Sequence, residues 1–451
     1  MPTLGDLSRR ASETLAAASR GIGDRTGIIK QVSERMIETD EPRIFHAFTV
    51  ATDSGRLYGN PEQPMLRGSS GAGLTREVAM ASAVGETFER YCSGIYDDRD
   101  LIVSSYKHLQ SLGYRVANPS SFALYSQTQY TSPGFIHHPF SEDLEISWVQ
   151  GYSITCEKPV LVPACLVYVP FRYKHPSDLI AFGVSTGLCC QRSRAEAILG
   201  GLYEVVERDA FMCMWMNRMP SPQVEWRTGS WLAPILKERF EPCNVTLHLA
   251  DITADLAIPV LLGVLVDERQ DGLAVAVGAS ANLDPQTAAL KALNEAAQVR
   301  RWLKVMKQQS AGHSYRADFT DVVTFEDHVR LFSSLSSIAY LDFLLTNPET
   351  TDVTSIRSFG AATTRDDLKT CVLALAEKGF EVIAVDLTQP DISDLGFHVV
   401  KVLIPGMIDL NSDHNYPLLG GERLYTLPRR LGHTDRDPQE KELNSVPHPF
   451  P

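Results

Sequence analysis

Two short segments of the sequence place carboxylates and an arginine at helical spacing. Residues 86–90 read Glu-Thr-Phe-Glu-Arg, and residues 204–208 read Glu-Val-Val-Glu-Arg. Because side chains three positions apart share one face of an α-helix, each segment would present two carboxylates side by side. Like charges at this spacing repel unless water or a counter-ion neutralises them. The pattern therefore has two interpretations, a solvated acidic face or a buried set of acids that are paired or bind metal.

Apolar flanks favour the second interpretation. Ala81 and Val84 accompany the first segment, and Val205 and Val206 stand within the second. Carboxylate oxygens suit Mg²⁺, which keeps several waters and shares its coordination shell with substrate phosphates. Four carboxylates from two facing helices could hold two Mg²⁺ ions, with arginines nearby for phosphate oxygens. The sequence lacks Gly-x-x-x-x-Gly-Lys-Ser/Thr, which excludes a P-loop nucleotide site.

Further polar residues follow the same helical spacing. Ser82 stands four residues before the first glutamate pair, and Glu196 stands eight residues before the second. Lys291, Glu295 and Gln298 stand at positions i, i+4 and i+7 of a third predicted helix. This spacing places the side chains of each set on one face of their helix.

Helices and strands alternate around these segments. Thr75 can cap the helix that carries the first segment, residues 193–216 predict the second helix, and residues 284–307 predict the third. Residues 1–40 read as a helical N-terminal extension. Strands are predicted within 44–60, 145–170, 243–251 and 258–267, and helix and strands alternate over 364–405. The combination predicts a mixed α+β (α/β) fold rather than a β-sandwich.

The composition excludes several classes of protein. With 42 Lys+Arg against 55 Asp+Glu the net charge is −13, which disfavours non-specific nucleic-acid binding. No apolar run approaches the roughly 18 residues of a membrane helix, and the first residues lack an apolar signal segment. The eight cysteines include no Cys-x-x-Cys. We therefore expect buried free thiols in a cytoplasmic protein, with redox activity of Cys189 and Cys190 as the alternative.

Taken together, these motifs resemble those of the YcaO family. Residues 82–90 read Ser-x-x-x-Glu-x-x-Glu-Arg, residues 196–209 carry the spaced glutamates of the second family motif, and residues 291–295 match the third. Residues 419–425, Leu-Gly-Gly-Glu-Arg-Leu-Tyr, agree as well, and the resemblance extends over roughly residues 40–451. It implies a YcaO-type fold that binds ATP and Mg²⁺ directly between helices, without a P-loop.

The resemblance also implies roles for individual residues. The Mg²⁺ ligands would be the four glutamates of the paired segments, Glu86, Glu89, Glu204 and Glu207. The nucleotide would be held by seven side chains of the same three helices, Ser82, Arg90, Glu196, Arg208, Lys291, Glu295 and Gln298. The sequence departs from the family pattern at four positions, with Ala72 for a lysine, Cys189 for a serine, Gly200 for a glutamine and Lys291 for an arginine. The last change keeps the charge but loses the bidentate fork.

The chain ends in Pro-x-Pro-x-Pro, within a polar segment over residues 433–451. One interpretation is a solvated proline-rich tail. The other rests on the resemblance, because this ending is similar to that of azoline-forming YcaO cyclodehydratases, in which the tail enters the active site. Pro447, Pro449 and Pro451 would then be catalytic, since a stiff polyproline II segment can hold the terminal carboxylate in place. Residues 41–432 would form the catalytic domain.

The activity implied by the resemblance is that of an ATP-dependent peptide heterocyclase of thiazole/oxazole-modified microcin biosynthesis. Cys, Ser or Thr of a ribosomally made precursor peptide would become thiazoline or oxazoline through phosphorylation of the amide oxygen, with the Pro451 carboxylate helping as a base. The implied partners are the precursor peptide, a separate E1-like or ThiF-like leader-binding protein, a flavin-dependent azoline dehydrogenase and a second copy of the chain in a homodimer. Peptide thioamidation, macrolactamidine formation and a non-catalytic ATP-binding scaffold remain as alternatives.

Overall fold

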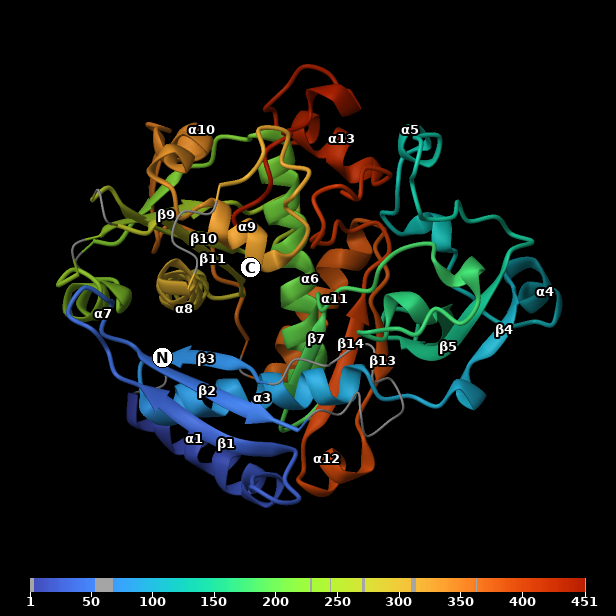
Figure 1. Ribbon diagram of the computed structural model, residues 1–451, viewed down its shortest axis with the longest axis horizontal. Coiled ribbons are helices and arrows are strands. Elements are labelled where there is room, and N and C mark those ends of the chain that lie inside the picture. Colours follow the sequence, from blue (N-terminus) through green and yellow to red (C-terminus); the bar gives the residue numbers. More distant parts are fainter. Residues whose placement is uncertain are drawn as a thin grey trace.

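One long helix, α6 (Arg194–Asn217), occupies the centre of the molecule, with sheets on either side of it (Figure 1). The computed structural model describes residues 4–52, 68–227, 229–243, 245–269, 272–309, 314–361 and 363–450. Within these residues the strands form three sheets of three, five and six strands. Ser193 caps α6, and most of its side chains are buried on all sides, as expected for a helix enclosed by other elements.

The three-stranded antiparallel sheet joins β1 (Ile29–Arg35), β2 (Phe45–Ala51) and β3 (Ser70–Gly73). Helix α3 (Arg76–Ser93) packs on this sheet, and α1 (Leu4–Ala18) packs on α3. The helical prediction for residues 1–40 is wrong over 29–35, because the backbone of this segment pairs with β2 and buries Ile29. The predicted strand over 44–60 is confirmed as far as Ala51, and its remainder falls within residues 53–67, outside the described residues.

The five-stranded sheet has the order β11-β10-β9-β8-β12 and lies between α6 and α8 (Pro285–Gln309). Its strands are β8 (Gln223–Glu225), β9 (Thr246–Asp251), β10 (Val260–Asp267), β11 (Ala274–Ala281) and β12 (Thr350–Asp352). Gly263 and Gly278 pair across β10 and β11. A Cβ on Gly278 would lie 2.5 Å from the Ala292 carbonyl oxygen, so the glycines let α8 approach the sheet closely.

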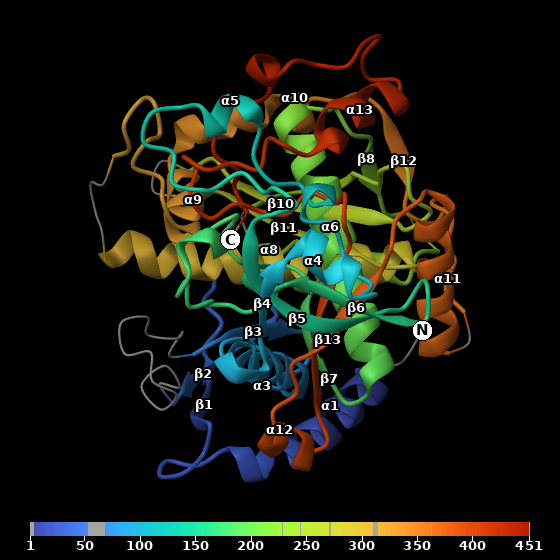
Figure 2. The same cartoon turned by 90° about the vertical axis from the view of Figure 1, so that its right-hand side faces the viewer.

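The third sheet has the order β4-β5-β13-β14-β7, with β6 paired to β5. Its strands are β4 (Ile102–Ser105), β5 (Glu145–Ser153), β6 (Lys158–Pro163), β7 (Leu188–Gln191), β13 (Ile383–Asp386) and β14 (His398–Leu403). Both α3 and α6 pack against β7 and β14. Figure 2 shows α8 running between the β10–β11 layer and the β3–α3 layer, so that α3, α6 and α8 approach one another at the junction of the three sheets.

Shorter helices cover the periphery. They are α4 (Tyr106–Ser111), α5 (Gln127–Tyr130), α7 (Leu232–Arg239), α9 (Phe325–Leu331), α10 (Asp342–Leu345), α11 (Thr364–Glu377), α12 (Pro390–Asp394) and α13 (Glu422–Arg430). The chain then returns inward, and its C-terminal end lies beside α6 and α9 in both views (Figures 1 and 2). The predicted mixed α+β fold is confirmed. Among the described helices, none has the length and apolar character needed to cross a membrane, and all eight cysteines are free thiols.

Candidate functional site

The first pair of glutamates is held in place on α3. The Thr75 side chain caps this helix, as its sequence predicts, by accepting a hydrogen bond from the Val78 N–H. Glu89 Oε1 accepts a hydrogen bond of 2.9 Å from the backbone N–H of Cys190 on β7. One turn earlier, Glu86 Oε1 lies 3.6 Å from Arg90 Nη2. The first pair therefore faces β7 rather than a fully solvated surface.

The second pair faces the same region from α6. Glu204 Oε2 accepts a hydrogen bond of 3.1 Å from the N–H of Gly187, just before β7. Arg208 contacts three acids, with Nη2 lying 3.5 Å from Glu204 Oε1 and 3.7 Å from Glu295 Oε1, and Nη1 lying 3.1 Å from Glu207 Oε1. Glu295 belongs to α8, where its Oε2 accepts a hydrogen bond of 2.9 Å from the Ala279 N–H. Arg208 thus joins the acids of two helices.

These acids form one electrostatic group, which we call the carboxylate cluster: Glu86, Glu89, Glu204, Glu207 and Glu295. Burial raises the pKa of Glu89 to about 8, against the attraction of Arg90 and with further repulsion from Glu86 and Glu204. Burial likewise raises the pKa values of Glu86, Glu207 and Glu295, and in each case Glu204 adds repulsion. Five carboxylates thus face two guanidinium groups, and an added cation would relieve the excess negative charge.

The cluster remains open to solvent on one side. The Glu207 and Arg208 side chains are only 10% exposed, whereas those of Glu86, Glu204 and Glu295 are 35%, 26% and 29% exposed. The same two arginines carry unused donors, because Nε of Arg90 and Nε of Arg208 are buried without a hydrogen-bond partner. Unpaired guanidinium donors can bind phosphate oxygens, and solvent-accessible carboxylates beside them can bind a metal ion. Together they suit a metal-bound polyphosphate.

Mg²⁺ fits this donor set better than a metal that needs a complete protein cage. In the described part of the chain, no three His, Cys, Asp or Glu side chains converge into a ready-made metal site. Mg²⁺ normally binds through one or two carboxylates, waters and phosphate oxygens. The residues present therefore fit Mg²⁺ and a polyphosphate bound together.

The remaining predicted nucleotide residues lie around the cluster rather than in it. Gln298 Nε2 donates to Ser70 Oγ at 2.7 Å, which ties α8 to β3. Ser82 is exposed on α3, and Lys291 is exposed on α8. Glu196 accepts a hydrogen bond from its own cap residue, Ser193, at 2.8 Å, about 12 Å along α6 from Glu204. Within the described residues, no hydrogen bond or ion pair joins these four side chains to the cluster.

Cys189 and Gly200, two of the residues that depart from the family pattern, lie in contact with each other. A Cβ on Gly200 would overlap with the Sγ atom of Cys189, so the absence of a side chain at 200 leaves room for the thiol. Burial raises the pKa of Cys189 well above its usual range, and Glu89 and Glu204 add repulsion while Lys291 opposes it. A neutral thiol therefore stands beside the cluster where the resemblance leads us to expect a serine.

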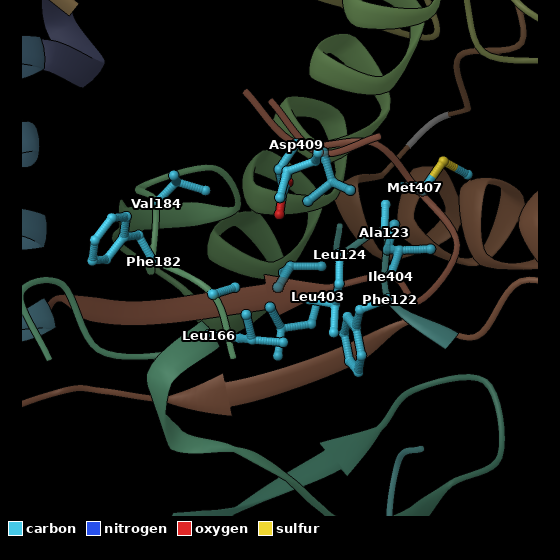
Figure 3. Close-up of a pocket in the computed structure, with 14 residues that line it drawn as sticks. Phe122, Ala123, Leu124, Leu166, Phe182, Val184, Leu403, Ile404, Met407 and Asp409 are labelled. Atoms are coloured by element: carbon cyan, nitrogen blue, oxygen red, sulfur yellow. The ribbon is translucent and has the colours of Figure 1, made fainter. Parts of the chain in front are cut away.

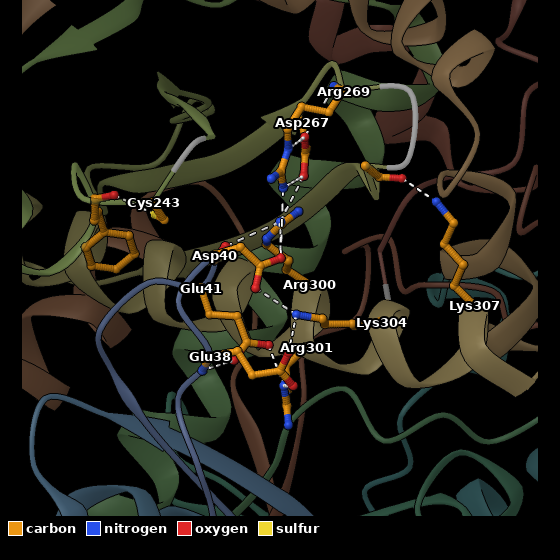
Figure 4. A network of polar contacts seen from close by, with 12 residues as sticks. Glu38, Asp40, Glu41, Cys243, Asp267, Arg269, Arg300, Arg301, Lys304 and Lys307 are labelled. Carbon is orange, nitrogen blue, oxygen red and sulfur yellow. Dashed lines mark hydrogen bonds and ion pairs between the residues drawn. The ribbon is translucent and has the colours of Figure 1, made fainter.

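A network of ion pairs holds the C-terminal half of α8 in place (Figure 4). Arg300 Nη2 lies 2.9 Å from Asp267 Oδ2, and Lys304 Nζ lies 2.7 Å from Asp40 Oδ1. Arg301 Nη1 reaches Glu41 Oε1 at 2.6 Å. This network connects the segment before β2 to the end of β10 and to α8. It positions the helix that carries Glu295 and Lys291 but does not contact the cluster.

The C-terminal tail packs against the cluster. The Phe450 ring is fully buried, its centroid lies 4.0 Å from the Arg208 guanidinium carbon, and it packs at 4.8 Å and a tilt of 57° against the Phe211 ring. Trp215 Nε1 donates to the Val446 carbonyl at 3.0 Å. Pro447 and Pro449 are buried, and Pro451 lies outside the described residues. Residues 447–450 are therefore part of the core, unlike a solvated tail.

Two histidines that sequence reasoning missed hold this tail. The rings of His328 and His448 stack at 4.0 Å. Since carbonyl oxygens accept, His328 Nδ1–H donates to the His448 carbonyl at 2.9 Å, and His448 Nε2–H donates to the Asn411 carbonyl at 3.0 Å. Burial lowers the pKa of His328 to about 4 and that of His448 further, so both rings are neutral. Nothing in the local sequence pattern distinguishes these histidines from others.

Sequence reasoning also missed Lys401 and Asp409, whose charges interact with that of Glu204. A signal was present, because Lys401 is a lone charge in the apolar run Val-Val-Lys-Val-Leu-Ile. Burial lowers the pKa of Lys401 to about 8 and raises that of Asp409 to about 6, and the charge of Glu204 acts on both. The chemistry of the site therefore extends beyond the carboxylate cluster.

The acidic cluster, its arginines and the three converging helices suit a protein that binds a polyphosphate together with Mg²⁺ and has no P-loop. The sequence model of the family described as YcaO cyclodehydratase, ATP- and Mg²⁺-binding, matches residues 70–408. The chain belongs to the YcaO family, as its motifs predict, and ATP and Mg²⁺ are its cofactors.

Three similar proteins illustrate this relationship. An uncharacterised protein of Methanothermobacter thermautotrophicus is 30% identical over 345 residues, covering 75% of this chain and 81% of the relative. An uncharacterised protein in the tfuA 3′ region of Rhizobium leguminosarum bv. trifolii is 27% identical over 250 residues, covering 53% and 56%. A solved heterocyclase in complex with substrate and cofactor is 25% identical with a TM-score of 0.78, covering 98% of this chain but only 57% of its own.

Proposed function

We propose that this chain is an ATP- and Mg²⁺-dependent cyclodehydratase that converts Cys, Ser or Thr of a ribosomally made peptide into thiazoline or oxazoline. One observation carries the proposal: the buried tail ends on Arg208, the same residue that joins Glu204, Glu207 and Glu295. The contact between Phe450 and Arg208 therefore brings the tail segment next to the phosphate-compatible cluster. The overall likeness to a heterocyclase of known structure supports the same reaction class.

The carboxylate cluster would hold the metal and the phosphates. Glu86, Glu89, Glu204 and Glu207 are the proposed Mg²⁺ ligands, and the buried Nε donors of Arg90 and Arg208 would bind phosphate oxygens. Bound Mg²⁺–ATP supplies the phosphoryl group that turns the amide oxygen into a leaving group. The surrounding side chains would bind the rest of the nucleotide: Ser82, Glu196, Lys291, Glu295 and Gln298.

The tail would supply a base. Cyclodehydration removes one proton from the nucleophile and one from the amide nitrogen, and a positioned carboxylate can accept either. Buried Pro447 and Pro449 stiffen the segment, while His448 and Phe450 anchor it. The Pro451 carboxylate is the proposed acceptor of one proton. The described part of the tail is anchored by three elements, since His328 belongs to α9, Phe211 to α6 and Asn411 to the segment after β14.

A partner protein would present the peptide. We propose that a separate E1-like or ThiF-like protein performs the leader binding, as the resemblance to azoline-forming members of the family implies. Such modules commonly add the leader as a strand to a sheet edge. Weak processing by the isolated chain and rescue by the partner would support this division.

Reconstitution tests the proposal. The chain, the partner and the precursor peptide encoded beside its gene are incubated with Mg²⁺–ATP and analysed by mass spectrometry. We expect each ring to reduce the peptide mass by about 18 Da, the mass of one water. Glu207→Gln should abolish this loss and ATP consumption, whereas Glu377→Gln, a matched change at the exposed end of α11, should not. Unchanged ATP consumption by Glu207→Gln would contradict the metal assignment.

Backbone thioamidation is the second candidate. One relative lies in a tfuA 3′ region, and a thioamidating YcaO enzyme would also activate the amide oxygen with ATP. The same mass measurement distinguishes the two, because exchange of oxygen for sulfur adds about 16 Da and requires an external sulfide. The buried Pro-x-Pro end of the tail favours cyclodehydration.

A further inference from the structure

A mostly apolar pocket lies beside α6 and is lined by side chains of several segments (Figure 3). Its walls include Phe122, Leu124, Phe182, Val205 and Met407. Val205 follows Glu204 directly on α6, so the pocket and the carboxylate cluster share a wall. Asp409 is the acid among the lining residues, and Figure 3 shows its side chain directed into the pocket.

The Asp409 carboxylate is not held by any other side chain among the described residues. Within the described residues no hydrogen bond or ion pair engages it, and its side chain is only partly buried. This distinguishes it from Asp209, which is buried and bound at 2.7 Å by Arg423. A carboxylate that is left unpaired in an apolar pocket costs stability, and such groups are common where a ligand or a reacting proton is expected.

A single loop connects this pocket to the cluster. Lys401, at 1% exposure, donates from Nζ to the carbonyl oxygens of Val184 and Thr186 at 2.6 Å each. The next residue in the loop, Gly187, donates its N–H to Glu204 Oε2 at 3.1 Å. A group seated beside Asp409 is therefore adjacent to the residues proposed to hold the phosphates.

The local electrostatics suit a proton acceptor. Burial raises the pKa of Asp409 to about 6, Lys401 opposes the rise, and the carboxylates of Glu204 and Asp209 reinforce it. A base is most effective when its pKa lies near the working pH, because it is then both deprotonated and basic. The buried Lys401, which has a pKa of about 8, keeps a compensating charge nearby.

We propose that this pocket receives the residue to be cyclised and that Asp409 accepts the proton of its thiol or hydroxyl group. The inference rests on the proposed cyclodehydratase function and assigns its substrate subsite. In the step, the new C–S or C–O bond forms as the S–H or O–H bond breaks. The proton moves to an Asp409 Oδ atom, and the carbonyl π electrons move to the amide oxygen. The second proton, on the amide nitrogen, is left for the tail carboxylate.

The geometry supports two bases acting from different elements. Met407 and Asp409 face the pocket, and two residues further on the Asn411 carbonyl accepts the hydrogen bond from His448 of the tail. One short segment therefore links the pocket to the anchored C-terminus. The apolar walls and the nearby acids suit a small, neutral side chain such as Cys, Ser or Thr and disfavour an acidic one.

The test separates catalysis from binding. Asp409→Asn and Asp409→Glu are compared in the reconstituted system with Asp394→Asn, a matched change on the exposed end of α12. We expect Asp409→Asn to lower kcat for cyclisation about 100-fold or more, with peptide KM and nucleotide affinity within about threefold of the unmodified protein. Asp409→Glu should recover part of the loss, because it restores an acceptor.

A second variant tests the pocket itself. Val184→Phe should fill the pocket from a partly exposed position and weaken binding of a fluorescein-labelled precursor peptide, measured by anisotropy without nucleotide, while leaving nucleotide affinity intact. Normal cyclisation by Asp409→Asn, or an equal loss of nucleotide affinity and rate, would overturn the assignment of Asp409. Failure of the unmodified protein to cyclise any peptide would overturn the proposed function itself.

Discussion

Neutralising one acid of the cluster should stabilise the protein in the absence of metal. The change is Glu89→Gln, which keeps an oxygen to accept the hydrogen bond from Cys190 N–H and removes the negative charge. Burial, together with Glu86 and Glu204, raises the pKa of Glu89 from 4.5 to about 8. Ionised Glu89 is therefore less stable in the folded protein than in the unfolded chain, and glutamine avoids this cost.

The magnitude follows from the linkage between proton binding and folding. Between pH 4.5 and 8 the folded state holds a proton that the unfolded chain has released, so stability falls as pH rises, by up to about 1.4 kcal/mol per pH unit. At pH 7.5 the upper bound is about 4 kcal/mol, and solvent access to the cluster reduces it to about 2–3 kcal/mol. With an unfolding entropy of about 2.1 cal/mol/K per residue, this corresponds to about 2–3 °C in Tm.

Thermal unfolding in EDTA at pH 5 and pH 7.5 measures the effect. Glu89→Gln should exceed the unmodified protein in Tm at pH 7.5 and differ by less than about 1 °C at pH 5, whereas Glu377→Gln should show no such pH dependence. Added Mg²⁺ with a non-hydrolysable ATP analogue should stabilise the unmodified protein more than Glu89→Gln. A lower Tm for Glu89→Gln at pH 7.5, or a difference independent of pH, would refute the reasoning about the cluster.

Three further outcomes are expected for the tail. Phe450→Ala removes a fully buried ring from Phe211 and Arg208, which should cost about 3–5 kcal/mol in the free energy of unfolding, measured by denaturant titration. The contribution of His328 to stability should fall as pH drops from 6.5 towards 4, because His328 stays neutral when folded and is protonated when unfolded. His328→Asn, which keeps a donor, should therefore gain stability relative to the unmodified protein between pH 6.5 and pH 4, as measured by thermal unfolding at those two pH values. Two residues added after Pro451 should slow cyclisation about a hundredfold with little change in nucleotide affinity, because a small misplacement of a catalytic group lowers the reaction rate strongly. An unchanged rate would show that the tail takes no part in the mechanism.

Helix periodicity predicted the acidic part of the site well. Thr75 and Ser193 cap α3 and α6 as expected, and the spacing of the glutamates brings both pairs to one region. The sequence left open whether those acids face solvent, because that depends on contacts with β7, such as the Cys190 and Gly187 N–H groups. Those contacts join residues about a hundred positions apart in one case and 17 in the other, and no local pattern encodes them.

Tertiary contacts also explain what was missed. Residues 29–35 have no strong strand pattern, and pairing with β2 determines their conformation. Asp409 meets the pocket, and Phe450 meets Arg208, only after separate segments pack together. Lys401 was the exception, since a single lysine within a buried strand is detectable from the sequence alone. Such a residue indicates a compensated charge and merits attention as a candidate for function.

The fate of the amide oxygen tests the account most directly. A precursor peptide with ¹⁸O in the carbonyl preceding the cyclised residue is processed by the chain and its partner with Mg²⁺–ATP, and the released phosphate is analysed by mass spectrometry. If the carboxylate cluster holds ATP for attack by the amide oxygen, one ¹⁸O atom should appear in phosphate for every ring formed. Unlabelled phosphate accompanying ring formation would contradict the account.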